Sequence, residues 1–260
     1  MVSIRQITNA LEAFAPLSLQ GDFDNCGYKI GDPDRMITGV LVTLDTNEAI
    51  IQEAVKKKCN LIIEHHPSVF RAIKYLDNTL PLHRTLIQAA KHDIALYSAH
   101  TNLDFTENGL NDYVAKQMGL LSVHKIDTPD GPRMGELSEQ TTLSEYADRL
   151  RKIFNDKNIV TIGDLSKTIK KVAVINGGGG SSEDDLLLAI RAGADVFVTG
   201  DVKYNVARLA KDAKYAIIQV GHYNSEQGFM PLVHSILQKA FPDVPIYETT
   251  ELDNPYNETR

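Results

Sequence analysis

Two adjacent histidines, His65 and His66, follow a short run of apolar residues and form the stretch best suited to chemistry. The run Leu61–Ile63 is typical of a buried strand in a parallel sheet, and such sheets bind ligands beyond the carboxyl ends of their strands. Pro67 cannot donate to a ladder and disfavours helical geometry in His66. We therefore expect the strand to end here and a bend to turn both imidazoles toward one cleft. Neutral imidazole is the commonest protein metal ligand, and the competing interpretation is a pair of surface histidines.

His222 and Glu226 are a second candidate pair because they lie four residues apart. If a helix begins just after Gly221, both side chains lie on one face, one turn apart, and offer a nitrogen and a carboxylate to the same point. The competing interpretation is a solvated pair at a helix start, where Glu226 is favourable near the positive end of the helix dipole.

Asp104 adds a further carboxylate after another predicted strand, Ile94–Ser98. The candidate metal ligands are therefore His65, His66, Asp104, His222 and Glu226. Three nitrogens and two carboxylates exceed the ligand set of a typical single zinc site, but they suit two metals if the carboxylates bridge. This ligand mixture is compatible with Zn, Mn, Fe, Co or Ni and does not choose among them.

His100 precedes Asp104 by four residues and has two interpretations of equal weight. It can support a metal ligand or act as a proton shuttle, or it can be a buried histidine that hydrogen-bonds to the backbone.

A glycine run, Gly177–Gly180, lies between a predicted strand and a predicted helix, where backbone N–H groups can face an anion. It lacks the spacing of the known phosphate-binding loops, and Glu183, Asp184 and Asp185 already place negative charge at the helix start. A turn capped by Ser182 explains it equally well. Lys203 and Tyr204, just past the next predicted strand, are better candidates for touching a substrate.

Alternating strands and helices must position these residues. The predicted strands are Thr38–Leu44, Leu61–His65, Ile94–Ser98, Ile159–Ile162, Lys171–Ile175, Asp195–Thr199, Tyr215–Val220 and Val244–Tyr247. The predicted helices are 3–14, 47–55, 80–91, 109–118, 143–153, 183–192, 202–213 and 226–239. Residues 21–31 are expected to be turn-rich. The pattern lapses over 122–133, so we place the boundary between an N-terminal half, 1–125, and a C-terminal half, 126–260, there.

The composition indicates a soluble cytoplasmic protein. The net charge is −7, so no global basic field attracts nucleic acid, and the alternative is a local basic patch. Its members would be Arg149, Arg151, Lys152, Lys157, Lys167, Lys170 and Lys171. No run approaches the roughly 18 apolar residues of a membrane helix, and no signal peptide is recognisable. Cys26 and Cys59 are expected to be reduced thiols.

Five segments resemble the NIF3-like proteins, which are also named GTP cyclohydrolase 1 type 2 homologs. The segments are FDNCGYKIG (23–31), LIIEHHPSVF (61–70), YSAHTNLDF (97–105), GADVFVTGDVKY (193–204) and GHYNSE (221–226). They span nearly the whole chain in the family's order. The resemblance implies an α/β fold of two interlocked halves, a dinuclear metal centre between them and a ring-shaped homohexamer. By position, the family's ligands fall on His65, His66, Asp104, His222 and Glu226.

Two departures from the family pattern stand out. Phe23 replaces the usual tryptophan, which we expect to change packing only, and the domain that longer members insert between the halves is reduced to a short linker near 122–133.

The first functional hypothesis is a metal-dependent hydrolase that acts on a small polar or nucleotide-like substrate. By resemblance, cyclohydrolase chemistry would add water to C8 of a guanine ring and release formate, with His100 as shuttle. The alternative is a non-catalytic metal-binding regulatory or interaction protein, including a ring that encircles DNA. A third reading, with structural histidines and no metal, accounts least well for the clustered ligand types.

Overall fold

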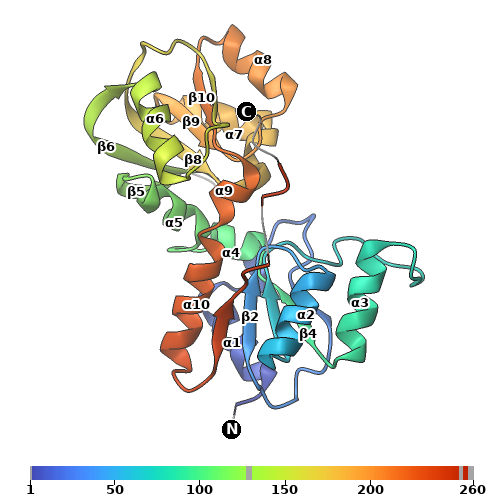
Figure 1. Ribbon diagram of the computed structural model, residues 1–260. Coiled ribbons are helices and arrows are strands. Elements are labelled where there is room, and N and C mark those ends of the chain that lie inside the picture. The colour runs from blue at the N-terminus through green and yellow to red at the C-terminus, as the bar shows by residue number, and fades with distance from the viewer. Residues whose placement is uncertain (1, 127–130, 252–253, 257–260) are drawn as a thin grey trace. The chain divides into compact units, whose positions relative to one another are not determined.

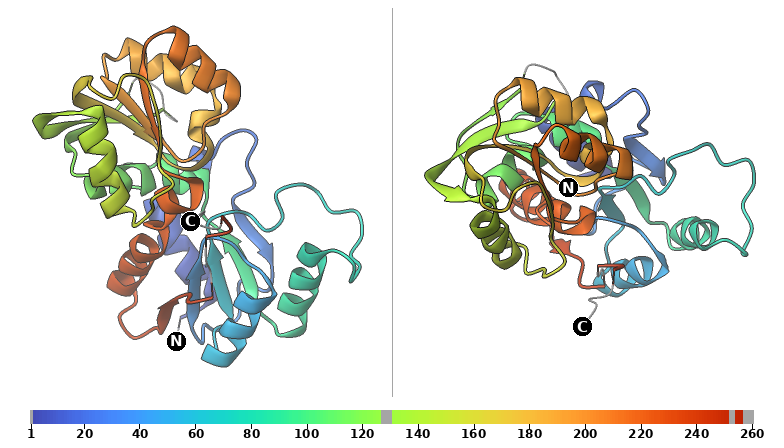
Figure 2. Two further views of the ribbon diagram at one scale, coloured as in Figure 1. Left: turned by 45° about the horizontal axis from the view of Figure 1, so that its top comes forward. Right: turned by 90° about the horizontal axis from the view of Figure 1, so that it is seen from above.

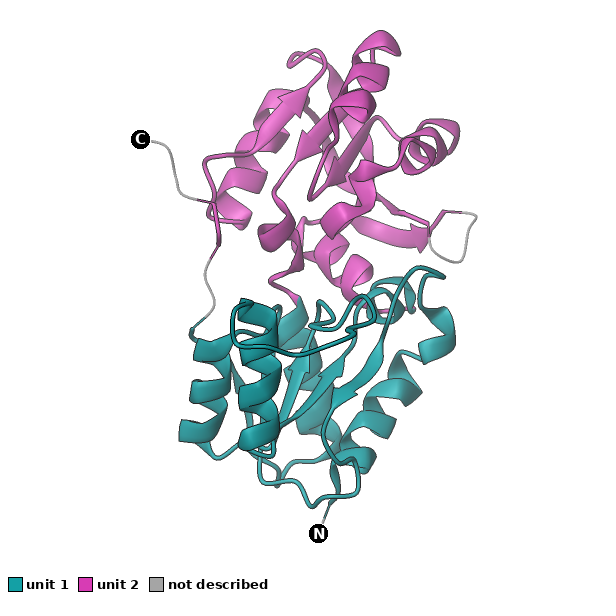
Figure 3. Cartoon of the chain, turned by 90° about the vertical axis from the view of Figure 1, so that its right-hand side faces the viewer, with its two compact units in different colours: residues 1–106, 229–253 teal, residues 107–228, 254–260 magenta. Residues whose placement is uncertain are grey.

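The computed structural model describes residues 2–126, 131–251 and 254–256. Contacts between residues divide the chain into two compact units (Figure 3). Unit 1 comprises residues 1–106 and 229–253, and unit 2 comprises residues 107–228 and 254–260. The chain therefore enters unit 2 earlier than the predicted boundary at 125/126, and it returns to unit 1 at residue 229.

The sheet of unit 1 has five strands in the order β1-β4-β3-β2-β11. The strands are β1 (Gly27–Ile30), β2 (Val40–Thr43), β3 (Leu61–Glu64), β4 (Ala95–Ser98) and β11 (Ile246–Glu248). Four of them are parallel, and β1 pairs with β4 in the antiparallel sense. All residues of β2, β3 and β4 are buried, which explains their continuous apolar runs.

Helices cover both faces of this sheet. They are α1 (Ile4–Phe14), α2 (Glu48–Lys57), α3 (Pro81–Lys91), α4 (Thr101–Phe105) and α10 (Phe229–Ala240), with a short 3₁₀ turn at Leu17–Leu19. Helices α1 and α10 lie on one face, and α2 and α3 lie on the other (Figure 1). Ser3 caps α1 and Asn47 caps α2 through their side chains, so the sequence located both helix starts.

The sheet of unit 2 has six strands in the order β5-β6-β8-β9-β10-β7. The strands are β5 (Leu121–Lys125), β6 (Arg133–Thr142), β7 (Val160–Ile162), β8 (Thr168–Ile175), β9 (Val196–Thr199) and β10 (Ala216–Gln219). The central strands β8, β9 and β10 are parallel, whereas β5, β6 and β7 pair antiparallel.

The helices of unit 2 pack on this sheet around an apolar core (Figure 2). They are α5 (Leu110–Gln117), α6 (Leu143–Ile153), α7 (Glu183–Arg191), α8 (Tyr204–Asp212) and α9 (His222–Glu226), with a 3₁₀ turn, η2, at Gly177–Ser181. Phe197 and Ile217 of the central strands contact Leu186 and Val206 of the helices in this core. Among the helices of residues 2–126, 131–251 and 254–256, none has the length and apolar character needed to span a bilayer.

Three expectations about elements require correction. Residues 27–30 form strand β1 instead of a turn, and the predicted linker 122–133 contains β5 and the start of β6. Residues 127–130 of that linker lie outside the described residues. The predicted helix 226–239 begins later, as α10 at Phe229, because Glu226 is the last residue of the separate helix α9.

Candidate metal centre

The carboxyl ends of β2, β3 and β4 are in register. Thr43 lies opposite Glu64, which lies opposite Ser98, so the residues that follow these strands emerge at one edge of the sheet. The backbone N–H groups of His65 and His66 both donate to Leu44 O, which ends the strand and bends the chain there, as predicted.

His65, His66 and His100 meet at this edge, and we call them the histidine triplet. One ring nitrogen from each lies within 4.8 Å of the others. The ring of His65 is 4.9 Å from that of His66 and 5.0 Å from that of His100, measured between centroids. Two nitrogens about 2.1 Å from one ion are at most about 4.2 Å apart, so small side-chain movements suffice for shared coordination.

Each imidazole of the triplet is held through Nδ1. His65 Nδ1 is 2.9 Å from the carbonyl oxygen of Ala99, and His66 Nδ1 is 3.0 Å from Asp45 Oδ1. Because these oxygens only accept hydrogen bonds, Nδ1 must carry the proton in both rings. The Nε2 atom of each neutral ring then keeps a lone pair, as a metal ligand requires.

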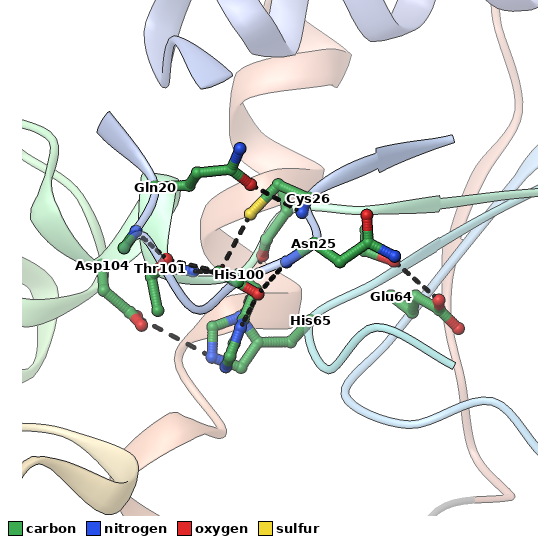
Figure 4. A network of polar contacts seen from close by, with 12 residues as sticks. Gln20, Asn25, Cys26, Glu64, His65, His100, Thr101 and Asp104 are labelled. Atoms are coloured by element: carbon green, nitrogen blue, oxygen red, sulfur yellow. Dashed lines mark hydrogen bonds and ion pairs between the residues drawn. The ribbon is translucent and has the colours of Figure 1, made fainter. Parts of the chain in front are cut away.

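Asp104 joins the triplet from the short helix α4. Its Oδ1 atom lies 3.8 Å from Nε2 of the fully buried His65 (Figure 4). Two ligands of one tetrahedral ion about 2.1 Å away are about 3.4 Å apart, so this pair is close to coordination distance. A lone pair facing a carboxylate also favours a cation or a proton between the two groups.

Asp24 supports the cluster from the loop before β1. Its fully buried side chain accepts hydrogen bonds from His100 Nδ1 at 2.9 Å, from the backbone and hydroxyl of Thr101, and from Cys26 Sγ. Burial raises the pKa of Asp24, but the hydrogen bonds and the charge of His100 outweigh it and hold this pKa well below its usual value. Asp24 therefore remains a carboxylate and fixes His100 in the Nδ1–H form.

Unit 2 contains a second cluster, which we call the His–Glu pair. His222 and Glu226 are the first and last residues of α9, and His222 Nε2 is 3.2 Å from Glu226 Oε1. His222 Nδ1 donates to Asp201 Oδ2 at 2.7 Å, just after β9. Nε2 of the neutral ring is then a lone-pair donor that faces a carboxylate at the spacing of two ligands of one ion.

Glycines leave room for the His–Glu pair. A Cβ atom on Gly177, which has φ +54°, would lie 2.0 Å from Glu226 Oε1. A Cβ atom on Gly200 would lie 2.8 Å from Ser225 Oγ and 2.9 Å from His222 Cα. Gly177 N donates to Ser225 Oγ, and Gly177 O accepts from Asp201 N. The glycine run is thus a packed turn beside the pair, and Ser182 caps the following helix α7 through its side chain, as the turn interpretation expected.

The donor chemistry of both clusters fits a divalent transition metal. Nδ1 of all four histidines is bonded to an acceptor oxygen, so Nε2 of each ring keeps a lone pair for a metal or a proton beside the carboxylates of Asp104 and Glu226. The structure therefore contains clusters of histidine and glutamate side chains that are close enough to hold a metal ion. The number of ions and their identity do not follow from these clusters.

The structure groups the predicted residues by unit. It brings His65, His66 and Asp104 together in unit 1 and pairs His222 with Glu226 in unit 2. His100 bonds to the Asp24 carboxylate and joins the triplet, so it is not the backbone-bonded histidine of the second interpretation. Asp24 and Asp201 were not predicted as site residues from the sequence. A polar residue just after a strand is the signal that marks Asp201.

Other predicted features lie outside both clusters. Tyr204 and Lys203 are exposed at the start of α8. Several members of the basic patch bind carbonyl oxygens: Arg151 donates to Ile159, Lys167 to Asp195 and Lys170 to Ser138. Both cysteines are free thiols, and burial raises the pKa of Cys26 to about 12 and that of Cys59 to about 11.

Comparisons with known proteins cover almost the entire chain. The model of the Duf34/NIF3 (NGG1p interacting factor 3) family matches residues 2–255. The GTP cyclohydrolase 1 type 2 homolog of Clostridium perfringens is 33% identical over 98% of this chain and 99% of its own. NIF3-like protein 1 of Drosophila melanogaster is 30% identical over 95% of this chain and 86% of its own.

Solved structures agree with this relationship. Protein SA1388 of Staphylococcus aureus superposes with a TM-score of 0.91 at 27% identity over 99% of both chains. Reduced HcgD from Methanocaldococcus jannaschii superposes with a TM-score of 0.80 at 26% identity over 95% of this chain and 97% of its own. The predicted α/β fold of the NIF3-like type is therefore confirmed, and the chain belongs to the Duf34/NIF3 family.

Proposed function

We propose that the protein is a metal-dependent hydrolase whose centre holds two divalent transition metals per chain. His65, His66 and Asp104 would supply ligands from unit 1, and His222 and Glu226 from unit 2. The observation that carries this proposal is that His65, His66 and His222 have the same tautomer. In each ring the Nδ1–H group donates a hydrogen bond to an oxygen, so Nε2 is the ligand atom.

Bound divalent metals supply Lewis acidity, which generates a nucleophile from water at neutral pH and polarises the bond under attack. The chain's own residues hold and orient these ions. Because His65 is buried and its Nδ1 is fixed on a backbone carbonyl, its Nε2 cannot rotate freely away from the site. Helical spacing brings Glu226 to His222, and the absence of a side chain on Gly177 leaves room for that carboxylate.

His100 is the proposed proton shuttle. Asp24 keeps the proton on Nδ1, so Nε2 is the atom that accepts a proton from water and later delivers it to a leaving group. Asp24 acts through His100 as a positioning residue. Unrelated hydrolases use the same arrangement: a buried carboxylate fixes the tautomer of a histidine that acts as the general base.

The proposed substrate is small and polar or nucleotide-like. Relatives that match at 33–35% identity are named GTP cyclohydrolase 1 type 2 homolog, which favours a purine nucleotide in the first screen. We further propose a cytoplasmic homo-oligomer, most simply the hexameric ring that the family resemblance implies.

Elemental analysis by ICP-MS tests the proposal on full-length protein purified without added metal or chelator. We expect about two transition metals per chain in the wild type. His65→Ala and His222→Ala should each lose metal, whereas His92→Ala, at an exposed position after α3, should retain it. A substrate screen led by GTP and phosphoesters follows. Full metal content and full activity in Asp104→Ala would contradict the proposal.

A non-catalytic regulatory role is the second candidate. The description of the matching family model names an interaction, that of NGG1p interacting factor 3. In this case the metals would stabilise a binding surface, and metal-loaded protein would turn over none of the screened substrates while still capturing a partner. Salt-dependent DNA binding would support the version in which a ring encircles DNA, because phosphate contacts release counterions.

A further inference from the structure

The loop that connects β3 to α3, residues 67–80, contains no helix or strand and extends away from the sheet of its own unit (Figure 2). We call it the 67–80 loop. Its first residues are fixed beside the histidine triplet, because Ser68 N donates to Glu64 Oε1 at 2.8 Å and Val69 O accepts from Asn25. Its last residues are fixed on α3, where Arg84 donates to the carbonyl oxygens of Asn78 and Thr79.

Between these anchors the loop and the start of α3 line an open surface pocket of about 540 Å³. This volume falls within the range of small-molecule sites, about 300–1,000 Å³. The residues of the lining that matter for recognition are Phe70, Arg71, Lys74, Tyr75, Leu82 and His83. All of them belong to unit 1.

The aromatic side chains of the pocket offer exposed ring surface. Phe70 is 42% exposed and Tyr75 is 67% exposed, which is unusual for two aromatic residues that line one pocket. Tyr75 makes an edge contact with the buried ring of His83, at 5.8 Å between centroids. An exposed aromatic face is a platform on which a planar ligand ring can stack.

Arg71 and Lys74 place two positive charges at the same pocket. Both are exposed, and neither forms an ion pair with any carboxylate that the structure describes. In a chain with a net charge of −7, two adjacent cations without an acidic partner favour an anionic ligand. Arginine in particular suits the planar, bidentate recognition of phosphate.

Phe70 links the pocket to the histidine triplet. It lines the pocket, and its ring meets that of His100 at 6.5 Å between centroids and 81° between planes. One aromatic ring, that of Phe70, therefore connects a ligand in the pocket with His100, the proposed proton shuttle.

We infer that the pocket beneath the 67–80 loop binds a nucleotide, with the base stacked on Tyr75 and the phosphate held by Arg71 and Lys74. The inference rests on the proposed function and deepens it, because it names the substrate class of the same site and the residues that select it. A ligand without an aromatic ring loses the stacking contact, and a ligand without a phosphate loses the contacts with Arg71 and Lys74.

Calorimetric titration of the full-length protein with three probes tests this inference, in buffer and again with EDTA to remove direct metal–phosphate contacts. GMP should bind more tightly than guanosine and more tightly than inorganic phosphate. Tyr75→Ala should weaken GMP about tenfold, since the stacking of one base on an aromatic ring has an effect of this order. The double variant Arg71→Ala/Lys74→Ala should weaken GMP, leave guanosine unchanged and reduce the dependence of GMP binding on salt.

Two matched variants serve as controls, the exposed aromatic Tyr256→Ala and the exposed cation Lys239→Ala, which lie outside the pocket. Both should bind GMP as the wild type does. GMP binding equal to that of phosphate, or unaffected by Tyr75→Ala and the double variant, would overturn the inference. Self-association that is lost in Tyr75→Ala, without nucleotide binding, would also overturn it and would identify the loop as an interface between copies.

The outcome separates this inference from the proposed function. GMP binding in EDTA that depends on Tyr75 supports the pocket even if no substrate is turned over. If Tyr75→Ala turns over a nucleotide in a metal-dependent reaction with an unchanged KM, the nucleotide does not bind in this pocket. The hydrolase proposal would remain intact.

Discussion

The histidine triplet of unit 1 and the His–Glu pair of unit 2 present similar ligand atoms but are built in opposite ways. The triplet is assembled from residues that follow two parallel strands and is supported by the buried carboxylate of Asp24. The His–Glu pair needs one helical turn, and glycines keep side chains away from it. The first cluster thus depends on buried hydrogen bonds, and the second depends on empty space beside α9.

This difference predicts which substitutions damage each cluster. Removal of a buried hydrogen-bond acceptor leaves its donors unsatisfied, which costs about 1–3 kcal/mol for each buried group. Addition of one carbon atom at a crowded glycine displaces a ligand while most of the fold survives. The largest effects on stability are therefore expected around Asp24, and smaller effects with a specific loss of metal are expected around Gly177.

Asp24→Asn should have the largest effect. The amide offers an N–H group where Thr101 and His100 both donate, so we expect a loss of about 2–3 kcal/mol in the free energy of unfolding, measured with urea. Asp22→Asn, at an exposed position in the same loop, is the control and should be near neutral. Equal stability of the two variants would contradict a supporting role for Asp24.

The pH dependence of Asp24 has a defined sign. Burial raises the pKa of Asp24, but hydrogen bonds and the charge of His100 together lower it by more than burial raises it. The folded-state pKa therefore lies below the unfolded value of about 3.9. The stability that Asp24 contributes is complete above this unfolded value and is lost as the pH falls toward the folded-state pKa. In EDTA, the wild type should lose stability below about pH 4 more steeply than Asp24→Asn.

Gly177→Ala should destabilise the protein less and affect metal binding more specifically. Alanine at φ +54° costs about 1–2 kcal/mol, and its Cβ atom would displace Glu226 Oε1. Gly193→Ala is a matched control, because Gly193 also has a positive φ, +77°, but no atom within 4 Å of the added carbon. Both variants should lose similar stability, and only Gly177→Ala should lose metal, as measured by titration with cobalt. Equal metal affinity in both would show that the clearance is unimportant.

The sequence predicted much of this arrangement for a physical reason. Buried parallel strands have continuous apolar runs, so β2, β3, β4, β8, β9 and β10 were located together with the polar residues that follow them. The pair His222 and Glu226 was located because helical spacing alone brings the two side chains together.

Tertiary contacts decided the features that the sequence did not indicate. The alternation of strand β6 is interrupted by three exposed residues in succession, 138–140, and its pairing with β5 and β8 makes it a strand. Strand β1 begins at Gly27, whose φ of +90° resembles a turn. Asp24 lies 76 residues from His100 along the chain, and Gly177 lies far from Glu226, so neither contact has a local signal.

Two equivalent carboxylates allow the clusters to be compared directly. Asp45→Asn and Asp201→Asn each replace an acceptor of a histidine Nδ1 proton with an amide that can also donate and so favour the opposite tautomer. Such partners typically change metal affinity by about 10- to 100-fold. We expect the larger loss for Asp201→Asn, because His65 and His100 remain beside His66, whereas His222 is the only histidine of its pair.

Glu248→Gln is the control for this pair of variants. Glu248 accepts from His234 Nδ1 at 2.9 Å with a similar exposure, and it belongs to neither cluster. It should leave metal affinity unchanged, and unfolding of all three variants should resemble that of the wild type, since partly exposed pairs contribute little stability. A greater loss of metal in Asp45→Asn than in Asp201→Asn would reverse the comparison.

The labelling rate of the Cys26 thiol is the smallest of the predicted effects, and it depends on Asp24 beside the histidine triplet. Burial raises its pKa to about 12, with a further contribution from Asp24, so at pH 8 only about one thiol in 10⁴ is ionised. Labelling with iodoacetamide should therefore be slow in the native wild type, although Cys26 is not fully buried. Asp24→Asn should accelerate labelling, because it removes the negative charge that opposes the thiolate. Gly177→Ala, which acts on the other cluster, should leave the rate unchanged, and an equal acceleration in both variants would mean that the two clusters are not independent.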